Sequence, residues 1–174
     1  MTDDQKIFSG RAWVFGDGIN TDVLAPGRYM AAPIKELAGH CLEALDPTFA
    51  ANVQPGDLVI AGEDFGVGSS REQAAEVLKL LGIGAVIAKS FGGIFFRNAF
   101  NLGLLAIVCE QSATIEAGSK VHVDPAAGQI CIPDKNIILT SEPVPDFLLE
   151  MANRGGLVAQ LETRLLGKAG KNDQ

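Results

Sequence analysis

The chain has 174 residues, of which 47% are hydrophobic and only 6% aromatic, and its formal net charge at pH 7 is −7. This length and composition are typical of one globular α/β domain with a full core, and they exclude a disordered chain. The acidic balance argues against nucleic acid or an anionic membrane as a partner. No apolar stretch resembles a signal peptide or a membrane span, so we expect a cytoplasmic protein.

Short apolar runs alternate with segments of helical periodicity along the first two thirds of the chain. The continuously apolar runs suit strands that are buried on both faces of a parallel sheet. The β-α-β-α-β order in the centre therefore favours a parallel sheet flanked by helices. In chain order, the predicted elements are a strand at 12–15, a polar loop at 20–29, a helix at 34–45, a strand at 58–61, a helix at 70–81, a strand at 85–88, a helix at 94–102 and a strand at 104–108.

The last third of the chain is richer in short strand-like segments with glycine or proline turns, which gives the parallel centre β-rich flanks. We expect one domain over residues 1–166 and a frayed tail over residues 167–174. The predicted elements of this part are strands at 120–123, 129–132 and 136–139, then helices at 145–153 and 156–166.

The most informative segment follows the predicted strand at 58–61 and reads Gly-Glu-Asp-Phe-Gly-Val-Gly-Ser-Ser-Arg-Glu over residues 62–72. Ser69 and Ser70 are each followed three residues later by Glu or Gln, which is the spacing of a capping box. A helix that begins here would gather hydroxyls, free N–H groups and the Arg71 cation into an anion site with potential acid–base groups. A simpler interpretation is that the serines only cap the helix and that Arg71 is solvated.

Other common enzyme motifs are missing. The chain has no Gly-x-Ser-x-Gly elbow and no Gly-Lys-Ser/Thr P-loop, and Arg71 stands where a dinucleotide fingerprint needs its third glycine. A phosphate- or nucleotide-binding α/β module that uses the Gly66 and Gly68 loop remains a weak alternative, as does a non-catalytic scaffold subunit. Cys41, Cys109 and Cys131 are far apart, so no zinc or iron–sulfur site can be assembled from this chain alone.

Five sequence blocks occur in a specific order along the chain. They are Gly16-Asp17-x-Ile19-x-Thr21-Asp22, Gly27-Arg28-Tyr29, Phe65-Gly66-x-Gly68-Ser69-Ser70-Arg71-Glu72, Ala88-Lys89-Ser90-Phe91 and Phe96-Arg97-Asn98. Joined in this order, they resemble the small subunits of the 3-isopropylmalate dehydratases, a family of the aconitase superfamily, over roughly residues 8–166. The resemblance implies the swivelling β/β/α domain of that superfamily. It also implies a separate large subunit that holds a [4Fe–4S] cluster, with no cofactor in this chain.

The resemblance further implies roles for individual residues in a hydro-lyase that moves the hydroxyl of a malate-type acid by dehydration and rehydration. Ser69 would be the base that takes a carbon-bound proton, while iron in the partner acts as Lewis acid on the hydroxyl. Asp17 matches an active-site aspartate, with a plain turn aspartate as the alternative. Arg71 and Ser70 would hold the substrate, and Arg28 resembles a second carboxylate-binding arginine rather than a solvated one.

The loop that follows Arg28 meets the substrate's γ-substituent in this superfamily. It reads Tyr29, Met30, Ala31 and Ala32, and homoaconitase-like members place an arginine in it. An unpaired carboxylate against these apolar side chains would be costly, whereas an aliphatic group would gain about 0.8 kcal/mol per buried methylene. We therefore expect 2-isopropylmalate and 3-isopropylmalate as substrates, with methylmalate or dimethylmalate and, less favoured, homoaconitate as open alternatives.

Three positions depart from the usual family pattern. Val67 stands where cysteine is frequent, and Gln73 replaces a frequent histidine. Gly92-Gly93 replaces a small residue followed by arginine, and this loss of a cation bears on the identity of the substrate.

Overall fold

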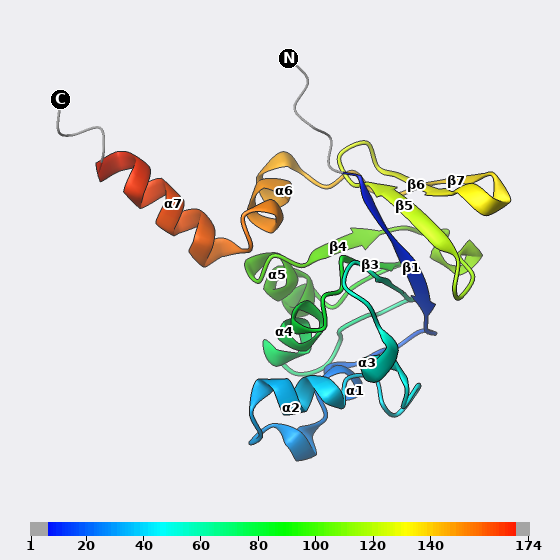
Figure 1. Ribbon diagram of the computed structural model, residues 1–174, viewed down its shortest axis with the longest axis horizontal. Coiled ribbons are helices and arrows are strands. Elements are labelled where there is room, and N and C mark those ends of the chain that lie inside the picture. The colour runs from blue at the N-terminus through cyan, green and yellow to red at the C-terminus, as the bar shows by residue number, and fades with distance from the viewer. Residues whose placement is uncertain (1–6, 170–174) are drawn as a thin grey trace.

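The computed structural model describes residues 7–169, and in this part of the chain seven strands form one mixed sheet in the order β4-β3-β2-β1-β5-β6-β7 (Figure 1). Strands β1 to β4 are parallel, whereas β5, β6 and β7 continue from β1 as antiparallel neighbours. The predicted α/β class, with a parallel centre and a β-rich flank, is confirmed. The strands are β1 Phe8–Val14, β2 Leu58–Ile60, β3 Ala85–Ala88, β4 Leu105–Val108, β5 Lys120–Asp124, β6 Gln129–Ile132 and β7 Ile137–Thr140.

Two helices, α4 and α5, connect the parallel strands β2, β3 and β4. All residues of β2 and β3 are buried, as expected for apolar runs at the centre of a parallel sheet. Helix α7 extends away from the rest of the domain (Figure 1). The helices are α1 Thr21–Leu24, α2 Ile34–Gly39, α3 Phe49–Asn52, α4 Gln73–Leu80, α5 Gly93–Asn101, α6 Asp146–Asn153 and α7 Leu157–Ala169, with 3-10 turns η1 Gly27–Tyr29, η2 Ser112–Thr114 and η3 Pro133–Lys135.

Several element boundaries differ from the sequence prediction. The helix predicted at 34–45 ends at Gly39, and shortly after it Leu42 adopts a left-handed φ of 59° that a continuing helix cannot accommodate. The polar loop at 20–29 contains the short elements α1 and η1. Helix α7 continues to Ala169, so the predicted tail begins in helix, and residues 170–174 lie outside the described part. Between residues 7 and 169, no helix is long and apolar enough to cross a membrane.

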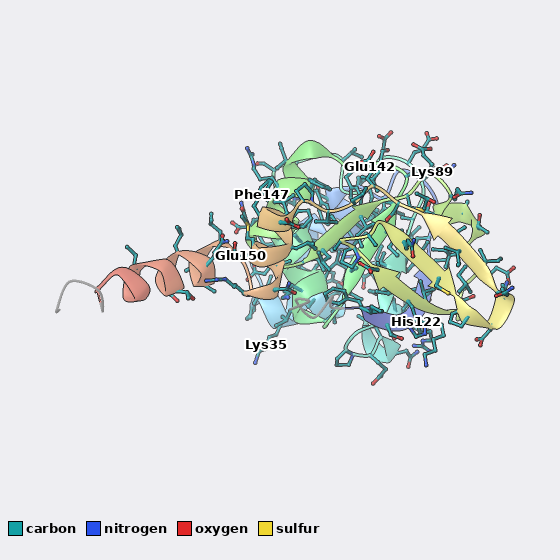
Figure 2. The ribbon with its side chains drawn as sticks, turned by 90° about the horizontal axis from the view of Figure 1, so that it is seen from above. Lys35, Lys89, His122, Glu142, Phe147 and Glu150 are labelled. Carbon is teal, nitrogen blue, oxygen red and sulfur yellow. The ribbon has the colours of Figure 1, made fainter. Side chains whose placement is uncertain are left out.

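Helix α6 and the start of α7 carry large apolar side chains that the described part of the domain leaves uncovered. Figure 2 shows Phe147 and Glu150 on α6, at the end of the domain from which α7 leaves. Phe147 is 62% exposed, and Val158 on α7 is 69% exposed.

Asp57 joins strand β1 to the turn before β2. Its carboxylate accepts hydrogen bonds from the Trp13 indole N–H at 2.9 Å and the Gln54 N–H at 3.0 Å, and it pairs with Arg11 at 3.3 Å. The Asp57 side chain is only 8% exposed. Burial by itself raises the pKa of this carboxyl group, but the hydrogen bonds from Gln54, Trp13 and Arg11 outweigh burial and lower the pKa below its ordinary value of 3.8.

The loop over residues 62–68, which follows β2, is fixed by backbone hydrogen bonds on both sides. One side pairs with residues 16–21 after β1, and the other pairs with residues 89–92 after β3. Three neighbouring parallel strands thus end in loops that hold one another in register. The bonds run from N–H to C=O or the reverse in the pairs Gly62–Gly16, Gly18–Glu63, Gly66–Ile19, Thr21–Val67, Phe65–Ser90, Lys89–Gly62 and Gly92–Phe65.

Gly66 is the point at which this loop packs on helix α5. Its φ is +76°, and a Cβ added there would lie 2.2 Å from Cγ of Phe95. Gly92 is also confined, since a Cβ added there would lie 2.8 Å from the Gly66 carbonyl oxygen. The loop geometry therefore depends on glycine for both conformation and space.

We expect Asp57→Asn to lower the free energy of unfolding at pH 7 by about 1.5–3 kcal/mol, the range for hydrogen bonds to charged groups. Because the folded-state pKa is lowered, the contribution of the carboxylate is present above about pH 4 and is lost as the pH falls through the folded pKa. Urea unfolding should therefore show a difference between wild type and variant that shrinks from pH 7 to pH 3. An equal difference at both pH values would contradict this account; the exposed Asp134→Asn variant serves as the charge control.

Gly66→Ala should reduce the free energy of unfolding by about 2–5 kcal/mol, since it combines left-handed strain with overpacking against Phe95. Gly16→Ala is the matched control, because nothing lies within 4 Å of a Cβ added at that position. Urea unfolding of both variants measures the difference. Equal stability of the two variants would show that the loop does not need a glycine at position 66.

Candidate active site

The predicted base and its neighbours lie between the 62–68 loop and helix α4. The helix begins at Gln73, and its N-cap residue, Glu72, makes no side-chain capping bond. The prediction that Ser69 or Ser70 caps this helix is therefore wrong, because the chain bends at Gly68 and Ser69 and the helix begins only at Gln73. Both serines are exposed, and neither hydroxyl caps helix α4.

Ser69 is held by a residue from the neighbouring loop. The Ser69 N–H donates to Oγ1 of Thr21 at 3.1 Å, and the two hydroxyl oxygens also lie 3.1 Å apart. Thr21 is only 3% exposed. Gly68 permits this approach: its φ is +119°, and a Cβ there would lie 3.0 Å from Oγ1 of Thr21.

Arg71 is oriented by acceptors on α1 and just after it. Its Nη1 donates to Oδ1 of Asp22 at 2.6 Å and to the carbonyl oxygen of Ala25 at 3.0 Å. Asp22 also accepts from the Gly27 N–H at 2.9 Å. The hydrogen bond from Arg71, followed by that from Gly27, lowers the pKa of the Asp22 carboxyl group. Among the described residues 7–169, both hydrogen bonds of the guanidinium use Nη1, which leaves the donors on its other edge for a planar carboxylate.

Arg28 forms a second cluster with an acid from the segment after α2. Its guanidinium pairs with Glu43 and lies 4.9 Å over the Tyr29 ring, and its side chain is 67% exposed. The Tyr29 ring stacks on His40 at 3.5 Å, and Nδ1 of His40 lies 2.6 Å from Oε2 of Glu43. The hydrogen bonds from His40 and then Arg28 lower the pKa of the Glu43 carboxyl group.

A cavity of about 270 Å³ lies beside these two clusters. Asp22 and Arg28 both line it, whereas Arg71 is bound to Asp22 but does not line the cavity. Larger cavities of about 390 Å³ lie against β1 and beside Lys79, away from the serines. The smaller cavity is lined by Asp22, Val23, Pro26, Gly27, Arg28, Glu43 and Ala44.

The predicted specificity loop is only partly accessible. Tyr29, Met30 and Ala32 are half-buried, and the first two pack against the hydrophobic core. Ala31 is exposed. Of these four residues, Ala31 is therefore the most accessible to a ligand.

Asp17 has a structural contact. Its Oδ1 accepts the Glu63 N–H at 2.7 Å, and a Cβ on Gly62 would lie 1.7 Å from that oxygen. The carboxylate thus fastens the loop after β1 to the 62–68 loop. A catalytic role for Asp17 stays a prediction.

Three residues of this site have no role in the sequence prediction: Thr21, Asp22 and Glu43. A signal exists for the first two, since Asn20 is a favoured N-cap and its Oδ1 accepts from the Asp22 N–H at 2.9 Å. An N-cap at Asn20 puts Thr21 and Asp22 in the first turn of a helix. Nothing in the sequence pattern singles out Glu43.

The described residues of this chain do not fit a metal cluster. Within residues 7–169, no three His, Cys, Asp or Glu side chains are placed to hold a metal ion. The three cysteines form no disulfide, and Cys41 and Cys109 are buried. Burial raises the pKa of the Cys41 thiol, which disfavours the thiolate that a metal needs.

Comparison with known proteins agrees with the fold. The aconitase C-terminal domain family matches residues 26–112. The chain is 50% identical over 150 residues to 3-isopropylmalate dehydratase small subunit 1 of Archaeoglobus fulgidus, covering 86% of this chain and 93% of that protein. It is 44% identical over 155 residues to the 3-isopropylmalate dehydratase small subunit of Halothermothrix orenii, covering 88% and 94%. The crystal structure of a 3-isopropylmalate dehydratase from Methanocaldococcus jannaschii matches with a TM-score of 0.89 and 42% identity, covering 95% of this chain and 99% of that one. The chain belongs to the family of 3-isopropylmalate dehydratase small subunits, which carry the aconitase C-terminal domain.

Proposed function

We propose that this small subunit completes a hydro-lyase that isomerises 2-isopropylmalate and 3-isopropylmalate by dehydration and rehydration. The observation that carries the proposal is the exposed Ser69 hydroxyl, which Thr21 holds by hydrogen bonds. Ser69 lies two residues before Arg71, in a chain of this family. A base and an anion-binding fork on one short segment suit the removal of a proton from a carbon next to a carboxylate.

In the proposed dehydration, Ser69 Oγ takes the proton of the substrate carbon. The electron pair of that C–H bond forms the C=C bond, and the neighbouring carbon loses its hydroxyl, for which iron in the large subunit would supply the Lewis acid. In rehydration the hydroxyl is added to the carbon that lost the proton, and Ser69 Oγ returns the proton to the carbon that lost the hydroxyl. Arg71 binds the carboxylate next to the acidic carbon and stabilises the charge that develops on it.

The remaining residues bind and orient the substrate in this proposal. Arg28 releases Glu43 and binds the second carboxylate of the substrate instead. The exposed Ser70 donates a hydrogen bond to the substrate. Asp17 orients groups across the interface with the large subunit. Ala31 faces the γ-substituent and favours an aliphatic group over a carboxylate.

We assign the [4Fe–4S] cluster to a large subunit. Two observations support this assignment: the donors between residues 7 and 169 do not gather into a metal site, and the relatives are named small subunits. Each subunit would then contribute part of one shared site.

The test is co-purification with a large subunit and an anaerobic assay of isopropylmalate isomerisation. We expect no turnover by this chain alone and turnover by the pair. In the pair, Ser69→Ala should lower kcat by about 10³-fold or more with little change in KM, because it removes the base rather than a binding contact. Turnover by the isolated chain, or near-full activity of Ser69→Ala, would refute the division of roles.

The control for Ser69→Ala is Ser119→Ala, which removes a hydroxyl of the same kind from another part of the fold. Ser119 directly precedes β5, outside the loops that form the site. The complex of Ser119→Ala with the large subunit should turn over like the wild-type complex. Equal binding of Ser69→Ala and Ser119→Ala to the large subunit would show that assembly is intact.

Substrate choice should depend on the side chain at position 31. Ala31→Arg should lower kcat/KM for isopropylmalate and raise it for a homologue whose γ-substituent ends in a carboxylate, because the new guanidinium pairs with that group. Ala31→Gln is the matched control, a long polar side chain without the charge. Kinetics with both substrates decide the matter, and an unchanged preference in Ala31→Arg would place the specificity pocket elsewhere.

A further inference from the structure

We infer that Thr21 is a positioning residue for Ser69, whose hydroxyl donates a hydrogen bond to Ser69 Oγ and so stabilises the deprotonated base. This inference rests on the proposed function, since it assumes that Ser69 acts as the base. It concerns a residue to which the sequence prediction gives no role.

The direction of the hydrogen bond follows from what each hydroxyl already does. Oγ1 of Thr21 accepts the Ser69 N–H at 3.1 Å, which occupies one of its lone pairs. The proton of the same hydroxyl needs an acceptor, because Thr21 is 3% exposed and a buried hydroxyl is costly when unpaired. Oγ of Ser69 lies 3.1 Å away. Ser69 is exposed, so its own proton can point to solvent or substrate instead.

The backbone holds Thr21 firmly enough for this task. Its N–H donates to the Val67 carbonyl oxygen at 2.9 Å, and its carbonyl oxygen accepts the Ala25 N–H at 2.9 Å. Two backbone hydrogen bonds therefore fix the position of Thr21 independently of its contact with Ser69. Gly68 then allows the chain to pass over that hydroxyl with no Cβ between them.

The chemical consequence concerns the charge on the serine. A serine alkoxide is unfavourable near neutral pH and needs donors directed at its oxygen. The hydroxyl of Thr21 supplies one such donor from the protein side, while the opposite side of Ser69 stays open for the substrate. When the substrate proton arrives on Ser69 Oγ, Thr21 keeps its own proton, so the step balances without further transfer.

The test compares Thr21→Val with Thr21→Ser in the complex with the large subunit. Valine keeps the shape and removes the hydroxyl, so kcat should fall on the order of 10²-fold while KM changes little, as for other lost donors to an oxyanion. Serine restores the donor and should retain most of kcat. With substrate deuterated at the abstracted position, the valine variant should show a primary isotope effect at least as large as that of wild type.

A double-mutant cycle separates this inference from the function on which it rests. If Thr21 acts through Ser69, the Ser69→Ala/Thr21→Val pair should be no slower than Ser69→Ala alone. Wild-type kcat in Thr21→Val, equal losses in the valine and serine variants, or additive losses in the double variant would each overturn the role of Thr21. Near-full activity of Ser69→Ala alone would instead overturn the proposed function.

Discussion

The hydrogen-bonded contact among three loops, at the ends of β1, β2 and β3, is the constraint on which the site depends. Parallel strands bring their carboxyl ends to one edge, but nothing in the sheet alone fixes the loops that follow. Here the 62–68 loop pairs with residues 16–21 on one side and 89–92 on the other. Such backbone pairing needs close approach without side chains, which explains glycine at positions 66 and 92.

This constraint determines how Ser69 and Arg71 are presented. The 62–68 loop places Ser69 over Thr21, and both partners of Arg71 come from α1 or the residue after it. The groups proposed to act on the substrate are thus oriented by one short segment, Thr21 to Ala25, which is itself fixed through the Val67 carbonyl oxygen. A base and an arginine that are two residues apart in sequence gain a defined geometry from contacts with a segment far away along the chain.

The sequence predicts this architecture well where periodicity is strong and poorly where contacts are long-range. It predicts strand β3 over the residues at which the strand is found, whereas α1 and α3, four residues each, are too short to show a period. Ser69 and Arg71 are predicted as neighbours, but their partners Thr21 and Asp22 are 48 and 49 residues distant and meet them only through the strand order. The capping interpretation fails because a capping-box spacing also occurs in a bend that precedes a helix.

In the proposed function this acidic chain binds a dianion and must rely on local cations to do so, since its net charge of −7 repels such a ligand at long range. Each predicted arginine is already paired with a carboxylate, and the two pairs have different consequences. Arg71 donates from Nη1 to Asp22 and Ala25, and these bonds orient its guanidinium. The donors on the other edge of the guanidinium stay available for a substrate carboxylate. Arg28 is more exposed and directs its guanidinium at Glu43, so a ligand must compete with that acid. An exposed pair is weak and screened by salt, and exchange of one carboxylate for another is therefore feasible. In the proposed function Arg71 thus acts as a fixed anchor and Arg28 as an exchangeable one, which suits a site that must accept both isomers of one diacid.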